Sequence, residues 1–267
     1  MNNILSKIKF AKCKWEEISV FATEYLVDYK ITVESFWEDH VLESNHYKIV
    51  LENMVIGYFS IHSNTTIMLF RVFPEYANIS QELFMQVKKY ENVTNAMVAT
   101  GDEFFMSHCF DSFLRIEKQA YFSIYTNKNL PKYNQKHITL RLVNINNEND
   151  VENFKLSDGF LDEEIPKLRN NLEELKVYFV ENESEIIGFG IIQYGQILKN
   201  TASIGMFVRP EYRQQGYAAN ILYSLKSIAE ENNYQAFSGC WYYNHNSKKS
   251  MESAGAYSKT RLIRFYF

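Results

Sequence analysis

Residues 207–219 read FVRPEYRQQGYAA, and this stretch joins an apolar run to a segment with helical spacing. The run before it, TASIGMFV (201–208), is typical of a strand. After it, small and aliphatic residues recur every three or four positions, which predicts an amphipathic helix whose buried stripe is Ala218, Ile221, Leu222, Leu225, Ile228 and Ala229. Lys226, Glu230 and Glu231 are expected on the opposite, solvent-facing side. Gly216 therefore lies where a strand gives way to a helix.

A glycine in this place predicts an anion-binding turn. The first N–H groups of a helix have no partner within the helix and carry the positive end of its dipole, so a phosphate can settle there. Gly216 allows the backbone to approach that phosphate without a Cβ in the way, and Ala218 keeps the next turn slim. Arg213 adds a fixed positive charge. Neither a GxxxxGK(S/T) loop nor GxGxxG is present, which argues against a nucleoside triphosphate or dinucleotide site.

The chain also contains an imperfect internal repeat. ENMVIGYFSI (52–61) is echoed by ENESEIIGFGII (181–192), and the sequence PEY occurs after both segments, at Pro74 and at Pro210. The alternative interpretation is that two α/β halves share generic patterns, but the matching segments come in the same order. The polar stretch TNKNLPKYNQK (126–136) has no periodicity and predicts a linker. We therefore expect two domains, 1–130 and 137–267.

The second half alternates strands and helices. A strand at 137–143 is followed by two helical segments, a hairpin, the strand and helix around Gly216, a strand at 236–244, a short helix ended by Gly255 and a last strand. The predicted order is β-α-α-β-β-β-α-β-α-β. This order predicts an α/β fold with a mostly antiparallel mixed sheet flanked by helices.

Composition narrows the function classes. The 267 residues carry a net charge of -4, with a pI near 5.9, which argues against a nucleic-acid-binding protein. The first residues show no long apolar core before a cleavage site, and no apolar run of about 18 residues is present, so we expect neither a signal peptide nor a membrane partner. The three cysteines lack CxxC spacing, which favours reduced thiols in the cytoplasm and predicts no metal site. The sequence does not indicate an oligomeric state.

These residues resemble a known superfamily. Arg213, Gly216 and Ala218 look like the pyrophosphate-binding signature (Q/R)-x-x-G-x-(G/A) of the GNAT acyl-CoA-dependent N-acyltransferases, and Val208 precedes it on the strand. The segment 244–256 resembles the second motif of that family, N-x-x-(A/S)-x(7)-G-(F/A), through Asn244, Ser247, Gly255 and Ala256. The resemblance covers about residues 137–267 and, more faintly, the first half, so that two tandem GNAT-like domains are expected.

The resemblance implies an N-acetyltransferase that transfers an acetyl group from acetyl-CoA to an amine of a small molecule or peptide. In such folds the strand before the signature splays from the next one, so its backbone is free to bind pantetheine like an added strand. A backbone N–H there could also donate to the oxyanion. The implied cofactor-binding residues are Met206, Phe207, Val208, Arg213, Gln214, Gln215, Gly216, Tyr217, Ala218, Asn244 and Ser247. Asn244 is equally consistent with a simple helix cap.

The sequence departs from the family where an acid and a base are expected. Met251 stands where members often carry a tyrosine, and 199–209 contains no carboxylate. Tyr242 and Cys240 share a strand face with Asn244 by alternation, and Glu164 lies on a helical segment expected over the substrate; these three are the catalytic candidates, although structural roles are open for each. These departures keep open a catalytically silent protein that binds or senses acyl-CoA, and a structural protein without a ligand.

The first half lacks the features of the turn. Its equivalent of RQQGYA is ANISQE (77–82), without glycine or arginine. Glu82 is expected in the first helical turn, where its charge would repel a phosphate, and Asn78 with Gln81 looks like a capping box. We therefore expect the first half to be a degenerate copy that keeps the fold and does not hold CoA.

Overall fold

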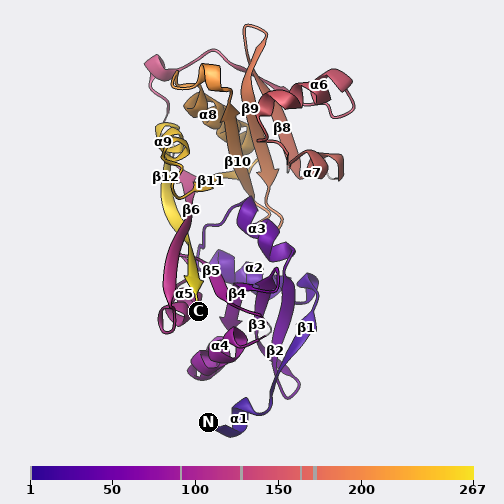
Figure 1. The fold of residues 1–267 in the computed structure, drawn as a ribbon, viewed down its shortest axis with the longest axis vertical. Helices are drawn as coiled ribbons and strands as arrows, with labels where there is room; N and C mark the ends of the chain where they lie inside the picture. The colour runs from indigo at the N-terminus through magenta and orange to yellow at the C-terminus, as the bar shows by residue number, and fades with distance from the viewer. Residues whose placement is uncertain (1, 91, 127–128, 163, 171–172) are drawn as a thin grey trace. The chain divides into compact units, whose positions relative to one another are not determined.

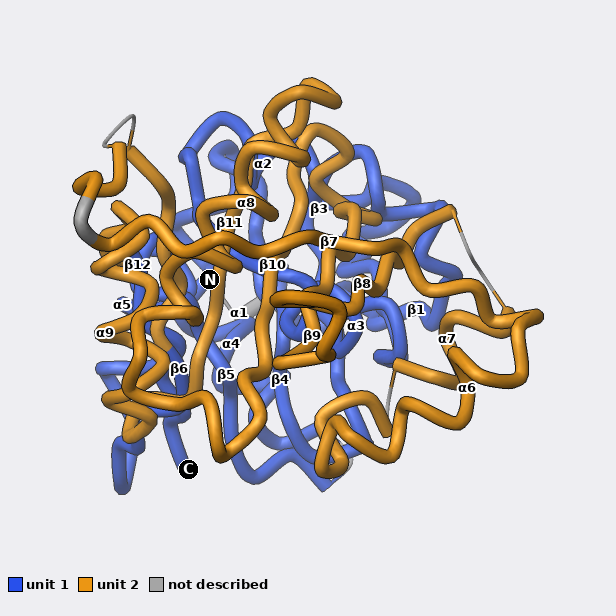
Figure 2. Tube along the Cα trace, turned by 90° about the horizontal axis from the view of Figure 1, so that it is seen from above, with its two compact units in different colours: residues 1–120, 260–267 blue, residues 121–259 orange. Residues whose placement is uncertain are grey.

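The structure of this protein is a computed structural model that describes residues 2–90, 92–126, 129–162, 164–170 and 173–267 (Figure 1). The chain forms two compact units (Figure 2). Unit 1 comprises residues 1–120 and 260–267, and unit 2 comprises residues 121–259. Both are mixed α/β, with strands flanked by helices. The predicted domain ranges 1–130 and 137–267 follow the sequence repeat, whereas the compact units assign the end of the last strand to unit 1.

Unit 1 starts with the short helix α1 (Asn2–Leu5). Its sheet has the strand order β1-β2-β3-β4-β5-β12, in which β4 and β5 are parallel and the other pairs are antiparallel. The strands are β1 (Ile8–Cys13), β2 (Asn45–Leu51), β3 (Met54–His62), β4 (Thr66–Val72) and β5 (Asn95–Ala99), with β6 (Arg115–Tyr125) passing on into unit 2. The helices are α2 (Ser19–Asp28), α3 (Ser35–Leu42), α4 (Ser80–Lys88) and α5 (Glu103–Phe110).

The last strand of the chain completes the sheet of unit 1. Residues Leu262–Tyr266 of β12 (Ala256–Tyr266) pair antiparallel with Asn95–Ala99 of β5. Phe265 is fully buried in the core of unit 1, where its ring contacts Phe110 at a centroid distance of 5.0 Å. The core of unit 1 is thus built from both ends of the chain.

Unit 2 has the predicted element order. Its strands are ordered β6-β11-β10-β9-β8-β7, with β10 and β11 parallel and β7 to β10 antiparallel. The strands are β7 (Thr139–Leu142), β8 (Leu175–Asn182), β9 (Glu185–Tyr194), β10 (Thr201–Val208) and β11 (Gln235–Trp241), together with the end of β6 and the start of β12. The helices are α6 (Glu148–Asn153), α7 (Glu164–Asn170), α8 (Tyr217–Glu231) and α9 (His245–Ser253).

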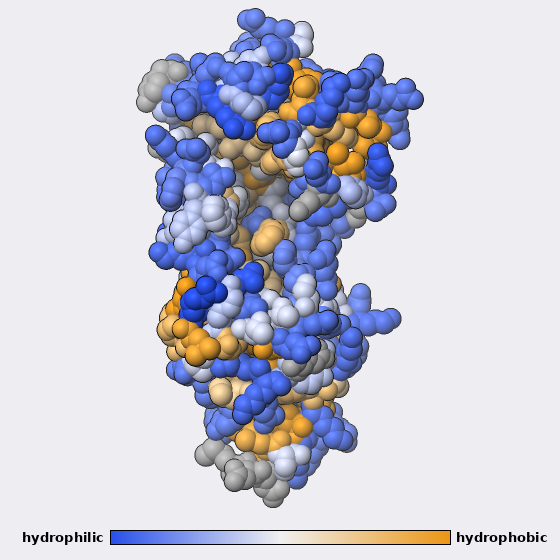
Figure 3. Space-filling view, viewed as in Figure 1, coloured by the Kyte–Doolittle hydropathy of each residue, from blue (hydrophilic) through white to orange (hydrophobic). Residues whose placement is uncertain are grey.

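Two apolar clusters cover opposite faces of this sheet. On one face, α8 and α9 pack Ile221, Leu225 and Met251 against Ile204 and Ala236 of the strands. On the other, Phe154, Leu161 and Leu168 from the α6 and α7 segments pack against β8 and β9. Figure 3 shows hydrophobic residues at the molecular surface between α6 and α7, and the partly buried members of this second cluster include Val151, Leu156, Phe160 and Ile165. Residues of β10 contribute to both clusters.

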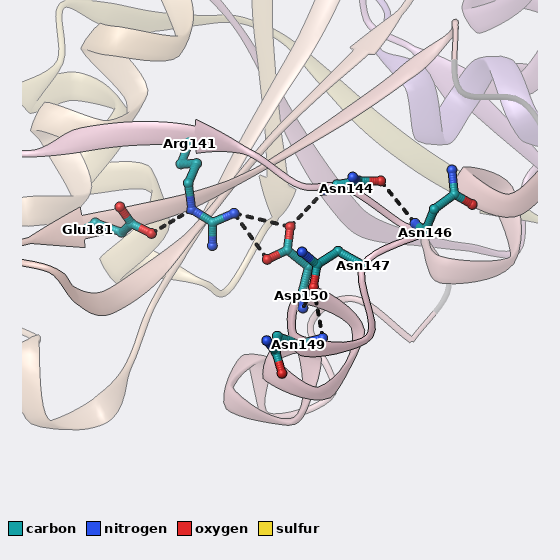
Figure 4. A network of polar contacts seen from close by, with 7 residues as sticks. All are labelled: Arg141, Asn144, Asn146, Asn147, Asn149, Asp150 and Glu181. Atoms are coloured by element: carbon teal, nitrogen blue, oxygen red, sulfur yellow. Dashed lines mark hydrogen bonds and ion pairs between the residues drawn. The ribbon is translucent and has the colours of Figure 1, made fainter.

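A network of polar contacts fixes the turn from β7 into α6 (Figure 4). Arg141 donates to both carboxylate oxygens of the buried Asp150, at 3.0 and 3.1 Å, and to Glu181 at 2.8 Å. Asp150 also accepts from the backbone N–H of Asn144 at 2.8 Å, and Asn147 caps α6. These bonds hold the first helix of unit 2 against the sheet.

The repeat seen in the sequence corresponds to equivalent structure. A Cβ added to Gly57 would lie 2.3 Å from the carbonyl oxygen of Arg71, and one added to Gly188 would lie 2.2 Å from that of Phe207. Each glycine is opposite the last valine of the next strand, and each strand is followed by a 3-10 turn that starts at the proline of PEY. The two glycines therefore meet the same steric requirement of one fold.

One expectation about α8 is wrong. Lys226 was expected on the solvent-facing side, but it is buried, whereas Glu230 and Glu231 are exposed as predicted. The side chain of Lys226 runs along the apolar surface, and its ammonium group reaches Glu230 at 2.6 Å. A long aliphatic stem with a charged end makes this possible, which a pattern based on residue type does not capture.

Candidate functional site

Strands β10 and β11 separate after a short paired segment. Their parallel pairing covers Thr201–Ser203 opposite Gln235–Phe237, while β9 stays paired with β10 as far as Val208. Within the described part of the chain, residues 204–208 of β10 and 238–241 of β11 have no ladder pairing with each other. One edge of β10 therefore offers backbone N–H and C=O groups to a ligand, as an unpaired strand edge does. Met206, Phe207 and Val208 lie on this edge, as the family resemblance implied, and their role in binding a cofactor stays a prediction.

The gap between β10 and β11 has free space beside Gly205. A Cβ added to Gly205 would meet no atom within 4 Å, and Met206 and Phe207 are only partly buried. In unit 1, β4 and β5 pair only at Thr66–Ile67 and Asn95–Ala96 and then separate in the same way. At the equivalent positions of β4, Leu69 and Phe70 are buried, whereas Gly205 and Met206 of β10 are partly exposed.

The turn after β10 has the backbone conformation that the anion hypothesis requires. Gly216 is the N-cap of α8 with φ 88°, and Gln214 also has a positive φ, of 62°. Residues 213–216 are exposed, and a Cβ added to Gly216 would approach only Cε of Lys136, at 3.9 Å. Because the first N–H groups of the 15-residue α8 have no partner within the helix, they can receive an anion here.

Arg213 stands beside this turn with an available charge. Its Nε donates to the carbonyl oxygen of Val208 at 2.9 Å, and its guanidinium lies 5.5 Å from the centre of the Phe207 ring. No carboxylate among the described residues lies within ion-pair distance of Arg213, whereas Arg209 contacts Glu211. The contact to Val208 fixes Arg213 near the end of β10.

Sequence reasoning missed two residues that secure the turn. The buried Asn220 donates to the carbonyl oxygens of Gly216 at 3.0 Å and Asn134 at 2.6 Å, and accepts from the backbone N–H of Lys136 at 2.9 Å. The predicted linker is therefore bound to the start of α8, which brings the side chain of Lys136 next to Gly216. The available signal was an asparagine one turn after the glycine, within an apolar stripe.

The second motif forms the turn from β11 into α9. Asn244 is the N-cap of α9, where its side-chain oxygen accepts from the backbone N–H of Ser247 at 3.1 Å. Of the two roles left open for Asn244, the capping role is thus present in the structure. Its remaining amide hydrogens are still able to donate to a ligand. The binding role of Asn244 and Ser247 stays a prediction.

The expected face shared by Cys240, Tyr242 and Asn244 is wrong. Strand β11 ends at Trp241, so the alternation on which that expectation depended stops before Tyr242. Tyr242 lies in a turn and stacks on Tyr121 at a centroid distance of 4.6 Å, while Cys240 packs against the α8 and α9 cluster. The asparagine cap starts α9 directly after the turn, which leaves no room for a longer strand.

Glu164 and Met251 occupy the elements predicted for them. Glu164 is the first residue of α7 and is partly buried, while Met251 is buried in the core under α8. Met251 therefore has a packing role in α9. The catalytic roles of Tyr242, Cys240 and Glu164 stay predictions.

The helix start in unit 1 differs from the one in unit 2. Helix α4 begins at Ser80 after a 3-10 turn over Pro74–Ile79, with Glu82 in its first turn as predicted. The expected capping box of Asn78 and Gln81 is wrong, because Asn78 belongs to the 3-10 turn and the N-cap is Ile79, without a side-chain cap. The hydroxyl of Ser80 instead donates to the carbonyl oxygen of Ala77.

Two family models match the chain in tandem. Residues 14–126 match a GNAT acetyltransferase domain, and residues 141–256 match the GNAT acetyltransferase family. The chain belongs to the GNAT acetyltransferases. This membership agrees with the open strand pair and the glycine turn of unit 2, and it extends to unit 1, whose resemblance is fainter in the sequence.

Solved structures of other GNAT proteins share the fold over nearly the whole chain. An acetyltransferase of the GNAT family from Colwellia psychrerythraea has a TM-score of 0.81 and 18% identity, covering 97% of this chain and 99% of that one. A GCN5-related N-acetyltransferase from Sphaerobacter thermophilus has a TM-score of 0.60 and 11% identity, with coverages of 97% and 95%. A tandem GNAT protein from the clavulanic acid biosynthesis pathway has a TM-score of 0.59 and 10% identity, and the match covers 97% of each chain. No curated protein sequence matches this GNAT chain significantly.

GNAT enzymes generally use acetyl-CoA, and the residues of unit 2 fit such a ligand. The open positions Gly205 and Gly216 leave room for it along the strand edge and at the helix start. No cluster of three or more metal-ligating side chains occurs among the residues described. In the same part of the GNAT chain, no helix is long and apolar enough to cross a membrane.

Proposed function

We propose that unit 2 is an N-acetyltransferase that moves an acetyl group from acetyl-CoA to an amine of a small molecule or peptide. One observation carries the proposal: an exposed glycine turn begins α8 directly beyond a strand edge that has no ladder partner among the residues that the structure describes. The turn suits a diphosphate and the edge suits a pantetheine arm, and they follow each other along the chain in the order that the two parts of CoA require.

Each residue of this region has a defined role under the proposal. Backbone N–H groups from Gln214 to Ala218 would hold the diphosphate, with Arg213 and Lys136 adding positive charge. The edge at Met206 to Val208 would bond to the pantetheine amides, and a backbone N–H there would donate to the thioester oxygen as negative charge develops on it. Bound acetyl-CoA supplies the activated acyl group for this reaction.

The step that most needs a catalytic residue is the removal of a proton from the amine. The amine nitrogen forms a bond to the acetyl carbon, the carbon–sulfur bond breaks, and CoA leaves as a thiolate or thiol. A thiol has a pKa of about 8.5, so its anion leaves without help from an acid, whereas an ammonium group of pKa about 10.4 must first lose a proton. Met251 cannot donate a proton, and its burial in the core is compatible with this mechanism. We infer that the proton acceptor is one of Glu164, Tyr242 and Cys240, or water.

Release of free thiol from acetyl-CoA, measured against a panel of amines, tests the proposal. We expect thiol release that depends on an amine, and its loss in Gly216→Glu. A second candidate function, silent binding of acyl-CoA, is favoured by the absence of a carboxylate from β10. Acetyl-CoA that stabilises the protein without thiol release, for every amine tested, would support this second function. No stabilisation by acetyl-CoA would contradict both.

A further inference from the structure

Two exposed aromatic rings stand where β11 ends. Trp241, the last residue of the strand, is 62% exposed, and Tyr243 is 50% exposed. Their ring centroids lie 4.9 Å apart in an edge-to-face arrangement. Large aromatic side chains this open to solvent bury little surface in the fold itself, so the stability of unit 2 does not explain their presence.

The turn that carries these rings is held from both sides. Tyr242, between them, stacks on Tyr121 with the ring planes 14° apart. Directly after the turn, Asn244 caps α9. Because Tyr242 packs on Tyr121 and Asn244 caps α9, the backbone that carries Trp241 and Tyr243 is fixed. Rigid presentation of aromatic side chains is typical of ligand subsites.

Strand alternation places Trp241 on the face of the sheet that α6 and α7 cover. Ser203 pairs with Phe237, so the side chain of Trp241, four residues after Phe237, is on the same sheet face as Phe207, four residues after Ser203. Phe207 stacks on Phe160 of the segment between α6 and α7, at a centroid distance of 5.5 Å. Aromatic rings therefore occur on both β10 and β11, on the face that α6 and α7 cover.

The charges around this turn select among amines. Lys248 of α9 lies 5.2 Å from the centre of the Tyr121 ring, and its partner Glu252 already neutralises it. The ion pair of Lys248 and Glu252 cancels its own charge, and the aromatic rings around this turn contact one another. A polyamine would gain little from such surroundings. An acceptor with one amino group on a short alkyl chain attached to an aromatic ring would stack that ring on Trp241 or Tyr243, and its ammonium form would be attracted to their faces.

We propose that the acceptor of unit 2 is a primary amine joined to an aromatic ring through a short alkyl chain, and that Trp241 and Tyr243 form the subsite for that ring. This inference rests on the proposed acetyltransferase function. Trp241 and Tyr243 are specificity residues that contact the body of the acceptor, away from the reacting nitrogen.

Tryptophan fluorescence tests the subsite without turnover. Of the three tryptophans, Trp15 and Trp37 belong to unit 1, and Trp37 is buried. Phenethylamine should change the emission of the wild type in a saturable way, whereas Trp241→Phe should show no such change. Butylamine and spermidine should produce a much weaker response. Equal responses to butylamine and phenethylamine, or an unchanged response in Trp241→Phe, would overturn the inference.

Kinetics provide the second readout. Trp241→Ala should raise the KM for phenethylamine roughly ten-fold, the size of one lost aromatic contact, and leave the KM for acetyl-CoA unchanged. Trp241→Phe should keep most of the affinity. Tyr257→Ala removes another exposed aromatic ring, on β12, and serves as the control that should change neither constant. If acetyl-CoA binds and other amines are acetylated but phenethylamine is not bound, this inference fails and the proposed function stands. If acetyl-CoA does not bind, the proposed function fails, and the fluorescence titration still reports on the subsite.

Discussion

A glutamate at position 216 should abolish binding of acetyl-CoA while leaving the protein folded. The new side chain has space, because a Cβ at Gly216 meets only the flexible end of Lys136, at 3.9 Å. The stability cost comes from the positive φ of 88°, which disfavours any residue with a Cβ by about 1–2 kcal/mol. We expect the unliganded variant to be destabilised by that amount and to unfold cooperatively.

The binding penalty is larger than this strain. Two like charges about 4 Å apart repel by about 4 kcal/mol at an effective dielectric constant of about 20. Acetyl-CoA at about 100 times its Kd stabilises a folded protein by about 2.7 kcal/mol. A loss of about 4 kcal/mol lowers the affinity nearly a thousand-fold. At the same ligand concentration, the stabilisation should therefore vanish.

Unfolding curves with and without acetyl-CoA, by heat or by urea, measure both quantities. Gly159→Ala is the matched control, since Gly159 is also in unit 2 with φ 80° and its added Cβ would meet Asp162 at 3.4 Å, an ordinary contact. It should carry the strain of a positive φ and keep the full stabilisation by the ligand. Gly216→Ala separates the effect of a methyl group from that of charge. Stabilisation of Gly216→Glu as strong as that of the wild type would refute the assignment of the diphosphate to this turn.

Three further predictions concern stability. Gly188→Ala should destabilise unit 2 by about 3 kcal/mol in urea unfolding because its Cβ would strike a carbonyl oxygen 2.2 Å away, whereas Gly205→Ala, with open space, should change stability by less than about 0.5 kcal/mol. Burial raises the pKa of Asp102 to about 6, so the folded state binds its proton more tightly and the free energy of unfolding should fall as pH rises from about 4 to about 6. Asp102→Asn, which keeps an acceptor for Tyr25, should flatten this part of the pH profile; an unchanged slope contradicts the assignment. Phe265→Ala should destabilise unit 1 by about 3–5 kcal/mol, although it lies at the end of the chain, and a loss confined to unit 2 contradicts the described packing.

The element order of unit 2 could be predicted from the sequence because the signals for each element are local. A strand, a glycine and an amphipathic stripe follow one another around Gly216, and each is encoded within a few residues. The open edge of β10 was also expected, though only from the family resemblance. The position of Asn220, which ties the linker to α8, depends on contacts between residues more than 80 positions apart, and no periodicity encodes such contacts.

Expectations failed where two local signals competed. Alternation from Ala236 onwards favoured a strand as far as Asn244, but a capping asparagine ended it at Trp241. Asn78 had the spacing of a capping box, yet the proline of PEY had already started a 3-10 turn that includes it. In both places the helix begins where its backbone can be capped or turned, and the pattern of side chains alone does not decide this.

The two copies of the fold differ in their glycines, and only some of these glycines are required for strand packing. A Cβ added to Gly57 or Gly188 would lie within 2.3 Å of a carbonyl oxygen on the neighbouring strand. Each copy of the fold therefore needs its own glycine so that the two strands can pair. A Cβ added to Gly205 or Gly216 would meet nothing closer than 3.9 Å, so packing does not require a glycine at either position, although the positive φ of Gly216 favours one. At the equivalent places unit 1 has the buried side chains of Leu69 and Phe70 and the acidic residue Glu82 in the first turn of α4. The open space at two points of unit 2, one on the strand edge and one at the helix start, supports the proposal that one ligand occupies both.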